Sequence, residues 1–484
     1  MIGNQSPNSA AVVDPQGQGP TAGAEHLHQT KVQAIKAFLK QHSGSQLNRN
    51  MGAGSMMAIV GTAISIASYP FYLHYLGYHR YGLWLVLSVV VSVAQLGNLG
   101  IPWALLKLVA EEHSHGNWEG VKTYINLGCG IILTAGIVFC VIITAARQMI
   151  LHWFKLTGAD AAVVYSMLPY IAVLSLVALL FSTFNAGLGG LGRMDLCSYN
   201  ETLSQIFVIV FSAVLLFMGY DLWGMTLGTL AAYVLAQVIS LVQVQRRMPI
   251  RLIARTSVNR HQLRLLLGTG GWILTSGAFA GLLLPFTRLM LSRYASLEAV
   301  AVNDMCVTGS IRVKNIFDAA FRPMIPELSG AQVKGKGSLT SHLRSIDRRA
   351  FMIVFAVGLP VFVVLILAMN PLLHLWLHRS FNSLLPGTFR IALVGGFLSL
   401  LGSSAYYMLI GLGSARDSAY SAGIQFFINA AFLLAVVLFA QRLTVEQAAI
   451  AFSLATGAST LYLRIRLYRF VRNRGLKAYE PASL

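Results

Sequence analysis

Charged residues are scarce in this sequence. Asp, Glu, Lys and Arg make up 11% of its 484 residues, whereas an ordinary soluble domain has about 25%. Apolar residues make up 56%, and the mean hydropathy is +0.64. Because so few charges cannot cover a water-exposed surface, this composition excludes a soluble protein. Acidic residues are rarer than basic ones. The chain has 17 Asp and Glu residues and 36 Lys and Arg residues, which gives a net charge of +19.

The basic excess does not form one continuous surface in the sequence. It lies in patches that separate long apolar runs. A nucleic-acid-binding face would instead cluster its Lys and Arg on one face or along one helix. We therefore predict no nucleic-acid partner, and we interpret the patches as a signal of membrane sidedness.

Cysteine is also rare. Cys129, Cys140, Cys197 and Cys306 stand far apart, without a C-x-x-C motif and without histidines at ligand spacing. This pattern favours neither a disulfide framework nor a zinc site. We expect no metal and no cofactor.

Two glycine patterns are similar to nucleotide-binding motifs. Gly187, Gly189 and Gly192 have G-x-G-x-x-G spacing, but they follow a membrane-length apolar run and not a strand. The stretch 330–337 nearly matches a P-loop, but Gly337 stands where a Ser or Thr would hold magnesium. We interpret the first pattern as a turn, and we predict that the protein is not an enzyme.

Residues 1–50 precede the first apolar run. The stretch up to about Gly23 is rich in Gln, Pro, Gly and Ser, so it has too little apolar surface to offset the entropy of ordering. We predict a disordered cytoplasmic tail over 1–50. Residues 31–41 could instead form a short amphipathic helix on the membrane surface. No charged segment precedes an early apolar region, which indicates that the run from Met51 is retained.

Twelve apolar runs follow, each near the roughly 20 residues that cross a bilayer as a helix. This pattern predicts an all-α integral membrane protein with about 12 transmembrane helices. The expected spans are 51–76, 82–106, 124–146, 161–185, 200–218, 223–243, 268–291, 299–328, 350–369, 388–410, 419–440 and 445–463.

The loop charges give the expected orientation. With the N-terminus in the cytoplasm, the inner segments hold 25 of the Lys and Arg residues and the outer segments hold 7. Cytoplasmic loops are the ones that accumulate Lys and Arg. We therefore expect both termini in the cytoplasm.

The longest inner loop divides the spans into equal halves. Residues 51–243 and 268–463 are predicted to form two six-helix bundles around a central cavity, joined by a basic cytoplasmic linker at 244–267. A basic tail follows at 464–484. Two such bundles can rock between inward-open and outward-open states.

The eighth span concentrates polar side chains. At helical spacing, Asp304, Arg312, Asn315, Asp318 and Arg322 share one face, and Lys314 lies at the edge of that face. Each charge at membrane depth costs about 3 kcal/mol on insertion scales, so the face should point into protein or a water-filled cavity. Asp318 is spaced to pair with Lys314 or Arg322. The alternative is an amphipathic helix on the cytoplasmic surface.

Arg288 adds a further cation in the seventh span. It follows Pro285, which should kink or unwind that helix. Arg288 could alternatively snorkel to the outer headgroups beside Arg293. Because cations outnumber carboxylates inside the spans, we expect an anionic ligand. The candidate substrate-binding residues are Arg288, Arg312, Lys314, Asn315 and Arg322. Asp304 and Asp318 are candidates for an ion pair with either a coupling or a structural role.

Four short pieces carry a family resemblance. The stretch Leu76-Gly-Tyr-His-Arg-Tyr-Gly-Leu-Trp84, then Leu96-Gly-Asn-Leu-Gly100 and Val109-Ala-Glu111, resembles the first two spans of polysaccharide transporters. These are the Wzx-type flippases of the multidrug/oligosaccharidyl-lipid/polysaccharide exporter superfamily. Pro326-Glu-Leu-Ser329 resembles the end of their eighth span. Asn98 stands where many relatives have an acidic residue, and the first span lacks the arginine of the related lipid II flippase.

The resemblance implies a flippase in the bacterial inner membrane. Its expected substrate is an isoprenoid-pyrophosphate-linked oligosaccharide, which crosses from the cytoplasmic to the outer leaflet by alternating access for cell-surface polysaccharide biosynthesis. Its implied partners are this lipid-linked oligosaccharide, membrane lipids, and a polysaccharide polymerase with its chain-length machinery. Two alternatives remain open: a multidrug or cation antiporter of the same fold, and a membrane-embedded polymerase or glycosyltransferase.

Overall fold

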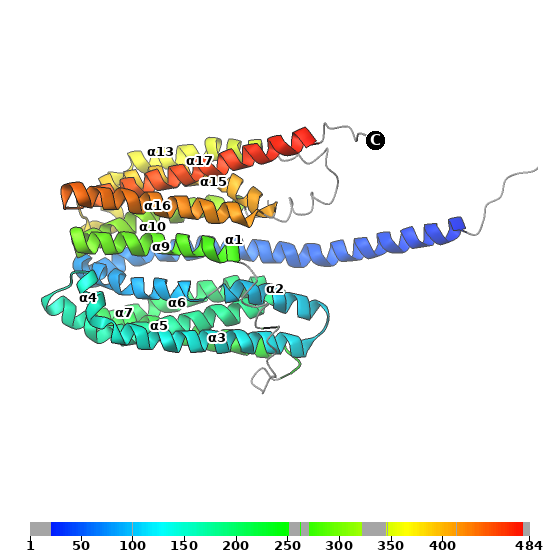
Figure 1. Cartoon of the computed structure of the whole chain (residues 1–484), viewed down its shortest axis with the longest axis horizontal. Coiled ribbons are helices and arrows are strands. Elements are labelled where there is room, and N and C mark those ends of the chain that lie inside the picture. Colours follow the sequence, from blue (N-terminus) through cyan, green and yellow to red (C-terminus); the bar gives the residue numbers. More distant parts are fainter. Residues whose placement is uncertain are drawn as a thin grey trace, which may run out of the picture. The chain divides into compact units, whose positions relative to one another are not determined.

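A computed structural model describes residues 21–98, 100–250, 262, 271–321, 345, 347–412 and 414–477. Its described elements are all helical, as the sequence predicts (Figure 1). Residues 53–484 form one compact unit, to which the contacts below belong. The α-helices are α1 (Thr21–Leu96), α2 (Ile101–Ser114), α3 (Trp118–Ala145), α4 (Arg147–Trp153), α5 (Gly158–Gly190), α6 (Met194–Phe217), α7 (Asp221–Gln245), α9 (Gly271–Tyr294), α10 (Leu297–Phe321), α13 (Leu359–Leu367), α14 (Met369–Leu377), α15 (Leu385–Gly411), α16 (Ala415–Ala440) and α17 (Val445–Lys477). A π-helical turn, η2 (Val354–Gly358), precedes α13, and a 3-10 turn, η3 (His378–Ser380), follows α14.

Among the described residues, ten helical stretches are long and apolar enough to cross a membrane. One of these, Ile59–Leu96, is 38 residues long and contains a kink at Gly77, where φ is 66° and ψ is 174°. The ten do not include α10, whose 25 residues carry five charged side chains. The all-α membrane fold is therefore confirmed, whereas the exact number of twelve spans remains a prediction.

The helix breaks are placed differently from the prediction. The expected span 82–106 is interrupted: α1 ends at Leu96 and α2 begins at Ile101. Gly100 has a φ of 69°, and its backbone N–H donates to Asn98 Oδ1 at 3.0 Å. In contrast, α9 runs continuously through Pro285. The predicted unwinding at Pro285 was therefore wrong, whereas the glycines at 97 and 100 do interrupt a predicted span.

The helices pack in two groups. Helices α2, α3, α5, α6 and α7 contact one another, and α9, α10, α13, α15, α16 and α17 contact one another (Figure 1). The predicted boundaries of the two bundles, with the linker and the two tails, remain predictions. Helix α1 already begins at Thr21, within the predicted tail.

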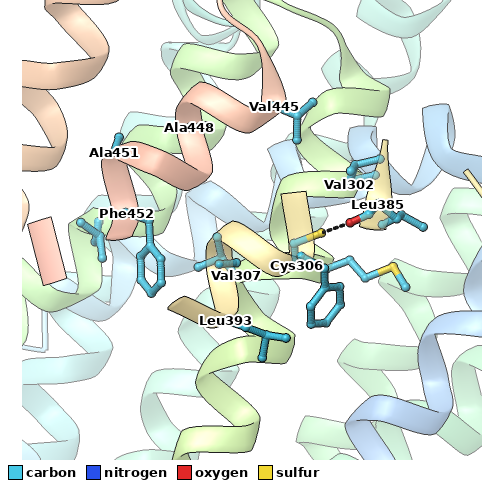
Figure 2. Close-up of a cluster of buried hydrophobic side chains, with 14 of the residues drawn as sticks. Val302, Cys306, Val307, Leu385, Leu393, Val445, Ala448, Ala451 and Phe452 are labelled. Atoms are coloured by element: carbon cyan, nitrogen blue, oxygen red, sulfur yellow. Dashed lines mark hydrogen bonds between the residues drawn. The ribbon is translucent and has the colours of Figure 1, made fainter. Parts of the chain in front are cut away.

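Helix α10 lies inside the second group. Figure 2 shows its side chains Val302, Cys306 and Val307 among side chains of α15 and α17. The Cys306 thiol points to the Leu385 carbonyl oxygen at 3.8 Å. Because all three side chains are fully buried, the alternative of a surface-lying amphipathic helix was wrong.

Glycine allows α6 and α7 to approach closely. A Cβ atom on Gly228 would lie 2.6 Å from the backbone nitrogen of Ser212, and one on Gly224 would lie 3.2 Å from the Leu215 carbonyl carbon. Gly224 and Gly228 form a G-x-x-x-G pair, whose missing side chains let two helices approach closely. A second G-x-x-x-G pair in α9, Gly277 and Gly281, differs, since Gly277 has open space around it. The turn predicted near Gly187 begins only after α5 ends at Gly190, with Gly192 at a φ of 77°, and residues 330–337 lie outside the described residues.

The glycine contacts give the first prediction. Replacing Gly228 by Ala should force α6 and α7 apart, because the new methyl group meets backbone atoms. Such overpacking costs about 1–3 kcal/mol, which should lower the thermal unfolding midpoint in detergent. Gly277→Ala is the matched control and should leave the midpoint unchanged. Equal midpoints for the two variants would contradict the close approach.

Candidate functional site

The first part of the α10 polar face forms an ion pair with α9. Arg288 donates from Nε and Nη2 to the same oxygen of Asp304, at 3.1 Å and 2.5 Å. The two side chains are only 12% and 4% exposed. Arg288 therefore does not snorkel to a surface, and Asp304 is its internal counter-charge.

The same arginine contacts α1. Its Nη1 donates to the Ser88 hydroxyl at 2.8 Å. Tyr69 and Tyr81, both buried, meet edge-to-face at 6.1 Å and lie within electrostatic reach of the ion pair. Polar groups from two other helices, α1 and α10, thus surround Arg288 of α9. The Ser88, Tyr69 and Tyr81 partners could not be predicted, because hydroxyl groups are common in apolar helices and no sequence spacing relates them to Arg288.

Arg312 is in a different electrostatic situation. It is half-buried on α10 and makes no ion pair or hydrogen bond with any side chain that the structure describes. Its charge reaches Tyr69, which also lies beside Thr308. Arg312 is therefore a cation close to α1 without a described carboxylate partner.

The second part of the polar face points into the second helix group. Lys314 Nζ donates to Asp318 Oδ2 at 2.5 Å, and their side chains are 20% and 6% exposed. Asp318 Oδ1 is buried and has no partner among the described groups. Arg322, the other predicted partner of Asp318, lies outside the described residues. Asn315 is half-buried on the same helix.

This second ion pair faces a polar cavity, which we call the hydroxyl chamber. Its volume is about 340 Å³. Five helices line it, and eight of the lining residues are serines or threonines that no sequence motif marks. They are Ser276 and Ala280 of α9, Lys314 and Asp318 of α10, Ser399, Gly402, Ser403, Tyr406 and Tyr407 of α15, Ser418, Ser421, Ala422 and Gln425 of α16, and Thr456, Ser459, Thr460 and Leu463 of α17.

A second cavity is almost wholly apolar, and we call it the apolar groove. Its volume is about 500 Å³. It lies between α1 and the helices α10, α13, α14 and α15. Its lining includes Tyr69 of α1, which lies within electrostatic reach of Arg312. Its lining consists of Ile66, Tyr69, Gly309, Val313, Leu365, Met369, Leu372, Leu373, Leu375, Trp376, Phe389 and Leu393.

The two helix groups are linked near the kink of α1. Hydrogen bonds run from Arg293 to the carbonyl oxygens of His152 and Trp153, and from Ser292 to that of Phe154. Beside the kink, Tyr78 donates to the Ser380 carbonyl oxygen at 2.6 Å. We call this side of the molecule the Gly77 end.

Comparison with known proteins identifies the family. A family model described as "Polysaccharide biosynthesis protein" matches residues 47–328, more than half of the chain. The chain belongs to this family. The chain is also 18% identical, over 360 residues, to a Shigella flexneri protein named "Putative O-antigen transporter", covering 74% of this chain and 84% of that relative.

Solved structures show the fold. A multidrug resistance MATE family transporter of the MOP superfamily, in an inward-facing conformation, matches with a TM-score of 0.70 at 15% identity, covering 88% of this chain and 96% of that one. A MOP superfamily transporter from Pyrococcus furiosus, with a binding pocket described as of reverse polarity, matches with a TM-score of 0.60 at 14% identity over the same shares. The chain thus belongs to the polysaccharide biosynthesis protein family and has the MOP transporter fold. The resemblance to polysaccharide transporters, which its short motifs indicated, is confirmed.

The buried ion pair gives the second prediction. Asp304→Asn should leave Arg288 as an uncompensated buried charge, and breaking such a pair costs about 3–5 kcal/mol. The double variant Asp304→Asn with Arg288→Gln removes both charges and should recover much of that loss, as a positive coupling term in a double-mutant cycle. Membrane abundance and thermal unfolding in detergent measure the effect. If the double variant is as unstable as the sum of its single variants, the two residues do not depend on each other.

Proposed function

We propose that this protein is a flippase that moves an isoprenoid-pyrophosphate-linked oligosaccharide from the cytoplasmic to the outer leaflet of the bacterial inner membrane. The observation that carries the proposal is the position of Arg312 near the apolar groove. On α10, Arg312 is adjacent to Val313, which lines the groove together with Gly309. A positive site next to an apolar groove suits a ligand with an anionic head and a hydrocarbon tail.

Charge balance supports an anionic substrate. Arg288 and Lys314 are each neutralised by an aspartate, whereas Arg312 has no such partner among the described residues. An arginine fork suits pyrophosphate, because it can donate two parallel hydrogen bonds to phosphate oxygens. Of the substrate-binding residues predicted from the sequence, we assign Arg312 to the pyrophosphate, with Asn315 on the same helix. Arg288 is instead assigned to the ion pair.

The groove supports a lipid-linked substrate. An isoprenoid chain can remain against apolar side chains such as Leu372 and Trp376 while the charged head follows the protein interior. This path avoids exposing the charge to hydrocarbon, which is the main energetic barrier to flipping.

Alternating access is the proposed mechanism. The links at the Gly77 end hold the two helix groups together on the side that the charge pattern assigns to the outside. Breaking these links while the opposite ends approach would expose the site to the outer leaflet. Both termini would lie in the cytoplasm, and a polysaccharide polymerase with its chain-length machinery would receive the product.

A multidrug or cation antiporter is the alternative that the shared fold allows. A cationic drug would need a carboxylate that is free to bind it. The described interior carboxylates of α10, Asp304 and Asp318, are both occupied by internal cations. This pairing favours the anionic substrate.

Arg312 gives the third prediction. Arg312→Ala should abolish flipping of a labelled lipid-linked oligosaccharide in proteoliposomes while membrane abundance stays near normal, since no described ion pair is broken. Arg312→Lys should restore flipping only in part, because a point charge lacks the bidentate fork.

The control for this test is Arg469→Ala, which removes an exposed arginine from α17. It should flip at the wild-type rate. Flipping at the wild-type rate by Arg312→Ala would show that this arginine does not bind the pyrophosphate.

A further inference from the structure

We infer that the hydroxyl chamber is a sugar-binding subsite, which receives a neutral sugar residue of the lipid-linked substrate. This inference rests on the proposed flippase function and adds to it the part of the protein that recognises the glycan. It is carried by the cavity between five helices of the second group and by the buried ion pair that faces it.

The chamber has no net charge from its ion pair but keeps unused polar groups. Lys314 uses one of its three N–H donors for Asp318, and Asp318 Oδ1 has no partner among the described groups. A ligand that satisfies both must donate and accept hydrogen bonds at once. A free anion would meet the Asp318 carboxylate, and a free cation would meet the Lys314 ammonium. A neutral polyhydroxylated ligand meets neither repulsion.

The hydroxyl groups of the lining are held in place by one another. Ser276 and Ser418 lie 2.8 Å apart, and Ser421 and Ser459 lie 2.7 Å apart. Gln425 donates to Thr456 at 3.0 Å. A site that is preorganised in this way binds with a smaller entropic cost than one whose side chains must first be ordered.

The chamber size limits the ligand. About 340 Å³ lies at the lower end of the range of ~300–1,000 Å³ that small-molecule sites occupy. This volume suits a single sugar ring and not an entire oligosaccharide. The rest of the glycan would remain outside the chamber.

Helices α9 and α10 both line the chamber. Helix α9 packs mainly on α16, whereas α10 packs mainly on α15. Small residues of α9, Ser276 and Ala280, line the chamber between them. Arg312 precedes Lys314 by two residues, about 3 Å along the helix axis, and side chains at this spacing lie on different faces of a helix. The proposed pyrophosphate site and the chamber are therefore at nearly the same depth on α10 but on different faces of it, so the sugar attached to the pyrophosphate would enter the chamber around this helix.

The test compares two probes that differ only in the sugar: a polyprenyl pyrophosphate without sugar, and the same lipid carrying one hexose. Their dissociation constants are measured on the purified full chain in detergent. The wild type should bind the hexose-bearing lipid about tenfold more tightly or better. Ala422→Leu fills the chamber and should abolish this preference without weakening the bare lipid. Ala431→Leu, an exposed position on the same helix, is the matched control and should keep the preference.

A second variant covers the case in which Ala422→Leu does not fold. Lys314→Gln with Asp318→Asn removes both charges together and should also reduce the hexose preference toward unity. If filling the chamber leaves the preference intact, or weakens both lipids equally, the sugar subsite is wrong. Equal wild-type affinity for both lipids would overturn the subsite and leave the flippase proposal standing, whereas failure to bind either lipid would overturn both.

Discussion

The cost of charge in an apolar interior is the constraint on which the rest of this structure depends. Helix α10 carries two aspartates and two basic residues in its described interior part, and it packs against α9, α15 and α17. Each aspartate meets one cation: Asp304 meets Arg288 from α9, and Asp318 meets Lys314 one turn away. Because an unpaired buried charge costs several kcal/mol, the Arg288–Asp304 pair holds α10 in its contact with α9, while the Lys314–Asp318 pair neutralises two charges within α10.

The pairing also separates structural charge from functional charge. Arg312 lies between the two ion pairs along α10 and keeps its charge without a described partner. An uncompensated charge in the interior lowers the stability of a protein. Its presence therefore indicates a function. Its neighbours fit a ligand with three chemical parts. Arg312 suits a pyrophosphate, the apolar groove suits an isoprenoid chain, and the hydroxyl chamber suits a sugar.

Much of the fold could be predicted from the sequence, because apolar run length and loop charge are strong signals for membrane helices. The helix bounds agree closely for 223–243, observed as Asp221–Gln245, and for 419–440, observed as Ala415–Ala440. The break at Gly97–Gly100 was missed, since hydropathy does not distinguish a glycine in a helix from one in a turn. At Pro285 the sequence predicted an interruption, but α9 continues through it, because neighbouring groups can accommodate a proline inside a membrane helix.

The candidate site was predicted only in part. The polar face of α10 was visible from periodicity, and the i, i+4 spacing allowed the Lys314–Asp318 pair. The pairing of Arg288 with Asp304, 16 residues apart in two helices, depends on how those helices cross, and this is not encoded locally. The same holds for the chamber, whose serines and threonines come from four helices and follow no common motif.

The most direct test of the central claim is the fate of the lipid-linked oligosaccharide in cells that lack this protein. After deletion of the gene, the lipid pool is identified by mass spectrometry, and its leaflet is determined with an impermeant glycan-modifying reagent in intact cells and in opened cells. A flippase predicts that a pyrophosphate-linked oligosaccharide accumulates and is modified only after the cells are opened. Unchanged lipid pools, with normal modification in intact cells, would contradict the account.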